Sequence, residues 1–145
     1  MRKVVQRGSN RGIALVEYAL ATPLLLMMLA VALDFGMAMR TAEAVSSAAR
    51  AGAAWGSLST ANAANANGIQ TAVTTAAPDI SGLKVSSAQS CQCPGGTAVS
   101  CTGSCTGNML MYVQVNVQAT TTNFFSYSGL GFGGTTSAQA IMRVK

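Results

Sequence analysis

An unbroken run of apolar residues dominates the N-terminal third of the chain. Between Ile13 and Leu33 the one charged residue is Glu17. As a helix, this run would span about 31 Å, the thickness of the hydrocarbon core of a bilayer. The apolar positions surround such a helix instead of forming one stripe, which suits lipid better than the surface of a globular domain. The pattern therefore predicts one membrane-spanning helix over residues 13–33.

The helical pattern continues beyond Leu33 as a narrow seam of small residues. The seam residues recur at steps of three and four: Ala38, Ala42, Val45, Ala49, Gly52 and Gly56. Such spacing marks one face of a helix, and small side chains let backbones approach closely. We expect a single helix over residues 13–57, about 67 Å long, of which roughly half protrudes from the bilayer as a stalk. The seam could pack on the chain's own sheet or on other chains, and both possibilities stay open.

Residues 58–145 are expected to form a C-terminal head. Residues 57–68 are weakly patterned and are interpreted as a linker, after which Asn67 could cap a short helix that Pro78 ends. Alternating apolar residues predict strands over 109–119 and 138–144, and a short strand is expected at 83–85. A three-stranded antiparallel sheet packed on the upper helix is the simplest assembly, which makes the fold class α+β with a long N-terminal helix.

The formal net charge of +5 is concentrated at the N-terminus. Arg2, Lys3, Arg7 and Arg11 lie in the first twelve residues, and the rest of the chain carries five basic residues against four acidic ones. A nucleic-acid surface needs basic residues spread over a face or groove, so we expect no nucleic-acid partner. Positive charge before the apolar run places the N-terminus in the cytoplasm and the head outside.

The composition argues against catalysis. The chain is 50% hydrophobic and 9% charged, it has no histidine, and its four carboxylates are Glu17, Asp34, Glu43 and Asp79. His-based triads and His metal sites are therefore excluded, and little material remains for a pair of catalytic carboxylates. The Gly-rich segment 129–134 lacks the lysine of a phosphate-binding loop. We expect no enzyme, no cofactor, no metal and no small-molecule substrate.

Four cysteines, Cys91, Cys93, Cys101 and Cys105, lie in one segment of the head. Their C-x-C…C-x3-C spacing differs from the paired C-x2-C of common zinc sites, and an extracytoplasmic location favours disulfides. A bond from Cys91 to Cys93 would strain a very small ring. Two connectivities stay open: 91–101 with 93–105, or 91–105 with 93–101. Each bond would stabilise the head by up to about 3 kcal/mol.

Residues 120–136 are rich in glycine and carry four aromatic side chains: Phe124, Phe125, Tyr127 and Phe132. Aromatic side chains on a loop can anchor a partner. We expect them instead to fold back over the sheet.

Three fates of the N-terminal segment fit its physical pattern. A conventional signal peptide would be cleaved after Ala32 and would release a secreted, disulfide-bonded binding domain. Without cleavage the chain would be a bitopic membrane-anchored protein. Cleavage before the apolar run would leave the hydrophobic helix on the mature chain.

Two residues within the run do not suit a simple anchor. Pro23 removes one backbone hydrogen bond and predicts a kink. A carboxylate such as Glu17 costs a few kcal/mol in a membrane segment, so it calls for a partner unless it lies at the interface.

Taken together, these residues resemble a known family. Arg11-Gly12-Ile13, followed by Glu17-Tyr18 and by Pro23 with three leucines, looks like the processing site and helix of Tad (Flp-type) pilins. Asp34-Phe35-Gly36 and Ala48-Ala49-Arg50-Ala51-Gly52 look more narrowly like the TadE-like pseudopilins, or minor pilins. The resemblance covers residues 11–54.

The resemblance implies that residues 1–12 are a leader that a membrane-embedded prepilin peptidase removes after Gly12. Cleavage would expose an α-amine on Ile13, largely protonated at neutral pH. The resemblance further implies that Glu17, next to Tyr18, pairs with the Ile13 amine of a neighbouring subunit during assembly. The amine of the same chain is the other candidate partner.

The resemblance also implies partners and a location. Expected partners are other pilin subunits, the pilus assembly machinery, the prepilin peptidase and the inner membrane. The expected role is pilus biogenesis, adhesion and surface attachment. The protein is expected in the bacterial inner membrane as a single pass, N-terminus inside and head periplasmic, and later in a pilus at the cell surface.

Overall fold

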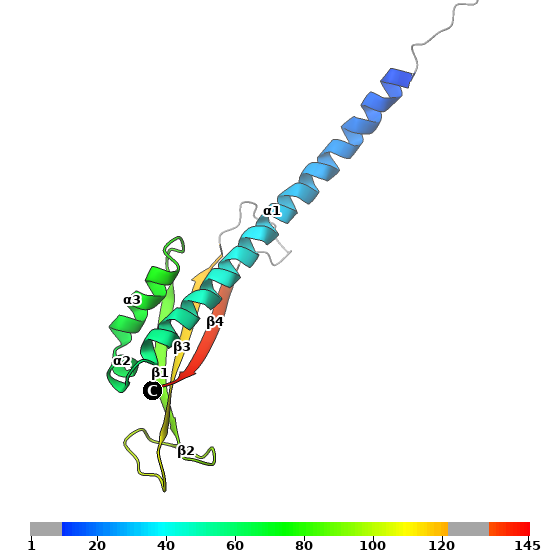
Figure 1. The fold of residues 1–145 in the computed structure, drawn as a ribbon. Coiled ribbons are helices and arrows are strands. Elements are labelled where there is room, and N and C mark those ends of the chain that lie inside the picture. Colours follow the sequence, from blue (N-terminus) through cyan, green and yellow to red (C-terminus); the bar gives the residue numbers. More distant parts are fainter. Residues whose placement is uncertain (1–9, 122–133) are drawn as a thin grey trace, which may run out of the picture.

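A long helix and a small antiparallel sheet make up the computed structural model, which describes residues 10–121 and 134–145. The elements in chain order are α1 (Asn10–Gly56), α2 (Thr60–Ala64), α3 (Ala66–Ala76), β1 (Lys84–Gln92), β2 (Ala98–Val99), β3 (Leu110–Thr120) and β4 (Thr135–Arg143). Figure 1 shows the first half of α1 projecting from the head as a rod and the second half packed against the sheet. The predicted α+β class is confirmed.

Some of the expectations lie outside the described residues. These are the leader up to Ser9 and the four aromatic side chains of the Gly-rich segment, Phe124, Phe125, Tyr127 and Phe132. Their roles stay predictions.

The sheet has four strands in the order β2-β1-β3-β4, with every neighbouring pair antiparallel. The expectation of three strands was therefore wrong by one, because the two residues of β2 pair with Cys91 and Gln92 at the end of β1. The first long strand also extends well past Val85. Its residues from Ser86 to Gln92 are small or polar and show no apolar alternation, so only pairing with β3 makes them a strand.

The core lies between the inner face of the sheet and the second half of α1. β3 contributes its alternating valines and α1 contributes small residues, while Ile69 and Val73 of α3 close the side. The fully buried side chains from α1 and β3 are Val45, Ala48, Ala53, Val113, Val115 and Val117. The C-terminal part of the small-residue seam, from Val45 to Gly56, therefore packs on the chain's own head and forms one wall of it.

The segment expected to be a linker is helical. Five of its residues form α2, whose N-cap is Ser59: the Ser59 side chain accepts a hydrogen bond from the backbone N–H of Asn62 at 3.1 Å. The cap of α3 is Asn65, which accepts from the Gly68 N–H at 2.9 Å. The expected cap at Asn67 was wrong, because α3 begins at Ala66 and Asn67 already lies inside its first turn.

Candidate functional site: the exposed apolar half of the long helix

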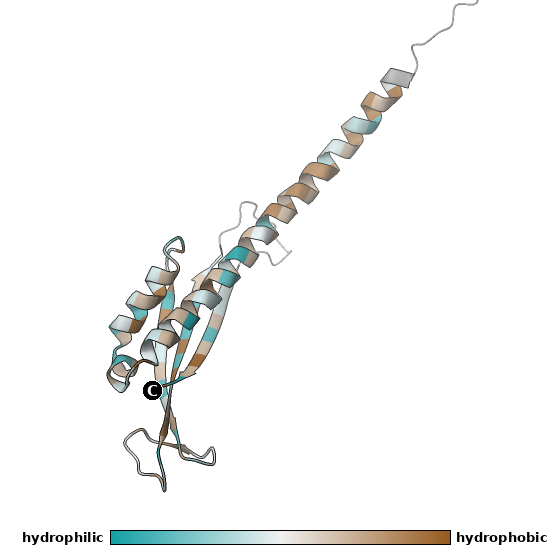
Figure 2. Cartoon of the chain, in the orientation of Figure 1, coloured by the Kyte–Doolittle hydropathy of each residue, from teal (hydrophilic) through white to brown (hydrophobic). Residues whose placement is uncertain are grey.

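The N-terminal half of α1 presents an exposed apolar surface. Its large side chains are open to the surroundings, from Ile13 at 65% and Tyr18 at 73% exposed to Leu33 at 55%. The most apolar 18-residue window has a mean hydropathy of 2.0 and none of it is buried. Figure 2 shows the apolar colouring around this half of the rod, in contrast to the mixed colouring of the head.

This surface needs a cover. Soluble monomers rarely expose contiguous apolar patches larger than a few hundred Å², because such patches associate. By length and composition, α1 can cross a membrane. Lipid tails or other apolar helices are the two environments that satisfy a helix that is apolar on every side.

Glu17 is the one carboxylate within residues 13–33 of α1. It stands four residues after Ile13, so the two side chains lie on the same helix face, one turn apart. Together with Val16 and Leu20 they line a shallow, open depression on that face. Among the described residues, Glu17 forms neither a hydrogen bond nor an ion pair. In an apolar setting, the desolvation of this carboxylate would have to be offset by a cation.

The Gly12–Ile13 bond lies in the opening turns of α1, which begins at Asn10. A Cβ added to Gly12 would meet no heavy atom within 4 Å, so packing does not explain a glycine here. Glycine lowers helix stability by about 1 kcal/mol relative to alanine. At the end of a helix it therefore favours local unwinding into an extended segment.

Pro23 lies inside α1, and the helix continues through it. One residue earlier, the Thr22 hydroxyl donates a hydrogen bond of 2.6 Å to the Tyr18 carbonyl. Threonine hydroxyls inside helices often bond the carbonyl four residues back in this way, whereas the carbonyl that Pro23 leaves without a backbone donor is that of Ala19. The kink expected at Pro23 stays a prediction.

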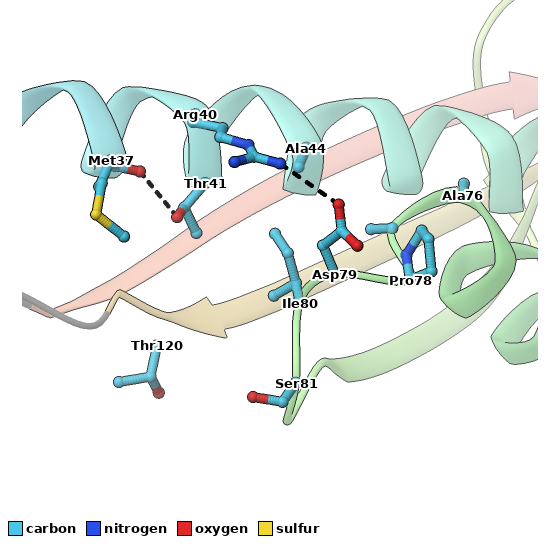
Figure 3. Close-up of a pocket in the computed structure, with 11 residues that line it drawn as sticks. Met37, Arg40, Thr41, Ala44, Ala76, Pro78, Asp79, Ile80, Ser81 and Thr120 are labelled. Carbon is cyan, nitrogen blue, oxygen red and sulfur yellow. Dashed lines mark hydrogen bonds and ion pairs between the residues drawn. The ribbon is translucent and has the colours of Figure 1, made fainter.

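Where α1 reaches the head, a small cleft opens between it and the turn from α3 to β1. The cleft has a volume of about 280 Å³ and is lined in part by Met37, Thr41 and Ile80. At its rim Arg40 points toward Asp79, with 3.4 Å between Nη2 and Oδ2 (Figure 3). Both side chains are 80% exposed, so this ion pair contributes little to stability.

The head ends, opposite the rod, in a tip that two disulfides hold. Cys91 is bonded to Cys101 and Cys93 to Cys105, with Cα–Cα distances of 5.1 and 5.5 Å. This is the first of the two connectivities left open by the sequence. All four cysteines are used, so the alternative zinc site has no thiolate ligand in this structure. Cys91 is buried at the end of β1, and its bond ties the tip to the sheet.

Asp34 was counted among the four carboxylates and noted in a motif, but no structural role was predicted for it. It is 3% exposed and is engaged in an interaction, and it marks the place where the apolar run gives way to the small-residue seam. The one signal in the sequence is a lone carboxylate directly after a long apolar run. Asp79 was likewise missed as the partner of Arg40, because 39 residues separate the two.

Comparisons with known proteins give one match. Neither the curated proteins nor the solved structures include a match to the chain. A family model does match, and its matched region ends two residues before the end of α1. Residues 12–54 match the family described as TadE-like protein, so α1 is similar in sequence to that family, and the match does not reach α2, α3 or the sheet.

Proposed function

We propose that this chain is a minor pilin or pseudopilin of a Tad-type pilus that contributes to pilus assembly and surface attachment. In this proposal it enters the inner membrane with its N-terminus inside, loses residues 1–12 to a prepilin peptidase, and joins other subunits through α1. The observation that carries the proposal is the apolar, exposed half of α1 with Glu17 one turn after Ile13, within the segment that matches the TadE-like family. Its role is structural and involves no catalysis.

Removal of residues 1–12 would change the electrostatics of this helix end. The four leader cations would be lost and a new α-amine would appear on Ile13. At 4 Å and an effective dielectric of 20, a pair of unit charges attracts by about 4 kcal/mol before desolvation is subtracted. A subunit out of step would leave two charges in the apolar bundle unmatched, so the pair between the Ile13 amine and Glu17 of a neighbour would fix the axial register.

The head fits the same location. Disulfides form and persist in oxidising compartments outside the cytoplasm, and this head carries two in one tip. With the N-terminus inside, α1 delivers the head to that side of the membrane. The tip then points away from the membrane, where a surface-attachment function would require it (Figure 1).

Substitution of Glu17 tests the proposal directly. We expect Glu17→Ala and Glu17→Gln to be inserted and trimmed as the wild type is, but not to enter filaments. Glu43→Ala is the matched control, since Glu43 is also an exposed carboxylate of α1 but lies beyond the apolar half. Filament yield and the mature mass are measured for each variant. Normal filaments from Glu17→Ala would contradict the role of Glu17 in register.

A further inference from the structure

The outermost strand of the sheet, β4, has an open edge. It is nine residues long and pairs on one side with β3, and no strand of residues 10–121 pairs with its other side. An open strand edge presents a row of backbone N–H and C=O groups that can template another strand.

The register shows which groups face outward. In an antiparallel pair, residues alternate between those that bond across the ladder and those that do not. At the two ends of β4, Gly134 accepts from the Thr121 N–H at 2.9 Å and the Val144 N–H donates to Met111 at 2.8 Å. The even-numbered residues of β4 therefore face β3. The odd-numbered ones direct their N–H and C=O groups away from the sheet: Thr135, Ser137, Gln139, Ile141 and Arg143.

Within residues 10–121 and 134–145, this edge lacks the usual protection against pairing. Natural edge strands are blunted by proline, by charged residues or by bulges. β4 contains no proline, pairs with β3 without interruption, and has one charge, Arg143, at its last position. Ile141 on the outer face is 56% exposed.

The opposite edge of the sheet, formed by β1, also presents unpaired backbone groups that could bond to β4 of another copy. β2 covers only the last two residues of β1, Cys91 and Gln92. The Cys93 N–H donates to Thr97 on the β2 side at 2.9 Å, so the odd-numbered residues of β1 face outward. Val85, Ser87 and Gln89 thus carry free backbone groups that no strand of the described residues satisfies.

Direction decides how the two edges can meet. β1 and β4 are each antiparallel to β3, so they run parallel to each other. If β4 paired with the β4 edge of a second copy around a two-fold axis, the two α1 rods would point in opposite directions. If β4 of one copy instead pairs in parallel with β1 of the next, all α1 helices point in the same direction. In that arrangement the helix-covered faces of both sheets lie on the same side.

We propose that the heads of adjacent copies join edge to edge, with β4 of one copy adding in parallel to β1 of the next. The choice of parallel pairing rests on the proposed function, because subunits anchored in one membrane must share a helix direction. The contact is heterologous, so it repeats from copy to copy without closing on a two-fold axis. The cations Lys84 and Arg143 lie at opposite ends of the joined strands and do not face each other.

Cysteine pairs on the outer face test the contact in membranes that contain the full chain. Gln139→Cys is co-expressed with Ser86→Cys, Ala88→Cys or Ser90→Cys, because three positions cover the possible registers. We expect oxidation to give disulfide-linked dimers with at least one of these partners at several times the yield of any variant alone. Dimers from Gln139→Cys alone would indicate β4–β4 pairing and overturn the proposal, and so would the absence of dimers in all three mixtures.

A single proline substitution in β4 supplies the second measurement. Gln139→Pro removes an outward N–H without removing a bond to β3, whereas Gln139→Ala keeps that N–H and serves as the control. Gln139→Pro is added to a chain that carries Ser137→Cys, and this chain is co-expressed with the β1 cysteine variants. We expect the dimer yield to fall several-fold while the melting temperature of the head stays unchanged. An unchanged yield would overturn the proposal. Filaments that form from the cysteine variants without any edge crosslink would leave the proposed function standing and this contact refuted, whereas processed wild-type chains that never assemble would refute the function itself.

Discussion

Gly52 of α1 lies so close to Val73 of α3 that a Cβ on Gly52 would come within 2.6 Å of the Val73 Cγ2 atom. The same Cβ would meet Ile69 and Val115 at 3.3 Å. One turn later, a Cβ on Gly56 would lie 3.1 Å from the Val113 Cγ2 atom. Two glycines four residues apart thus let α1 approach both α3 and β3, and the small-residue seam serves the packing of the head.

Gly52→Ala should destabilise the head by about 1–3 kcal/mol, because the added methyl must displace a buried valine. Thermal or denaturant unfolding of the detergent-solubilised protein measures this change. Gly36→Ala is the control: a Cβ there meets nothing within 4 Å, so that variant should unfold as the wild type does or slightly later. Equal stabilities for the two variants would show that α1 does not pack on α3 as described.

Asn65→Ala should cost about 1 kcal/mol of stability, since it removes the side-chain acceptor for the Gly68 N–H at the start of α3. Asn67→Ala should have a much smaller effect, because α3 has already begun at Ala66 and the Asn67 side chain is exposed. A comparison of the two melting temperatures checks the position of the cap. A larger loss from Asn67→Ala would place the cap where the sequence pattern first suggested it.

The two disulfides should contribute unequally. Replacing Cys91 and Cys101 together by alanine frees the tip from the sheet and leaves a space at the buried Cys91, so we expect a loss of about 3 kcal/mol. Replacing Cys93 and Cys105 affects half-exposed residues within the tip and should cost less. Unfolding curves of the two double variants, with and without reductant, give the comparison. A greater loss from the second pair would contradict the role of Cys91 as the tie to the sheet.

The sequence predicted those elements whose residues alternate or repeat by themselves. Val113, Val115 and Val117 alternate with polar residues, and β3 was placed to within one residue at each end. α2 was missed because its five residues, Thr60–Ala64, are alanine, asparagine and threonine with no apolar period. β1 was placed at its start but not over its length, because its small and polar residues become a strand only through pairing with β3.

The candidate site was predictable only where a local sequence pattern encodes it. The apolar rod and Glu17 follow from local sequence, because lipid-facing helices are apolar on all sides. The disulfide connectivity and the Arg40–Asp79 pair depend on how distant segments fold together, and no local pattern encodes them. The seam from Val45 to Gly56 showed that something packs closely, but only the structure identifies α3 and β3 as the neighbours.

Gly12→Ile should block removal of the leader. A branched side chain would oppose the extended fit of this segment in a protease cleft, while a Cβ at this position clashes with nothing in the folded chain. We expect the variant to fold and to insert, and to retain residues 1–12 in its intact mass. Gly36→Ile, a matched change at another exposed glycine of α1, should be trimmed normally. A trimmed Gly12→Ile protein would show that the leader is removed at another bond.

The central claim is that the apolar half of α1 stays on the mature chain behind a new N-terminus. N-terminal sequencing combined with the intact mass of the protein purified from its native membrane tests this most directly. We expect a mature chain that begins at Ile13 and has both disulfides formed. A mature chain that begins at Leu33, free of the apolar rod, would contradict it.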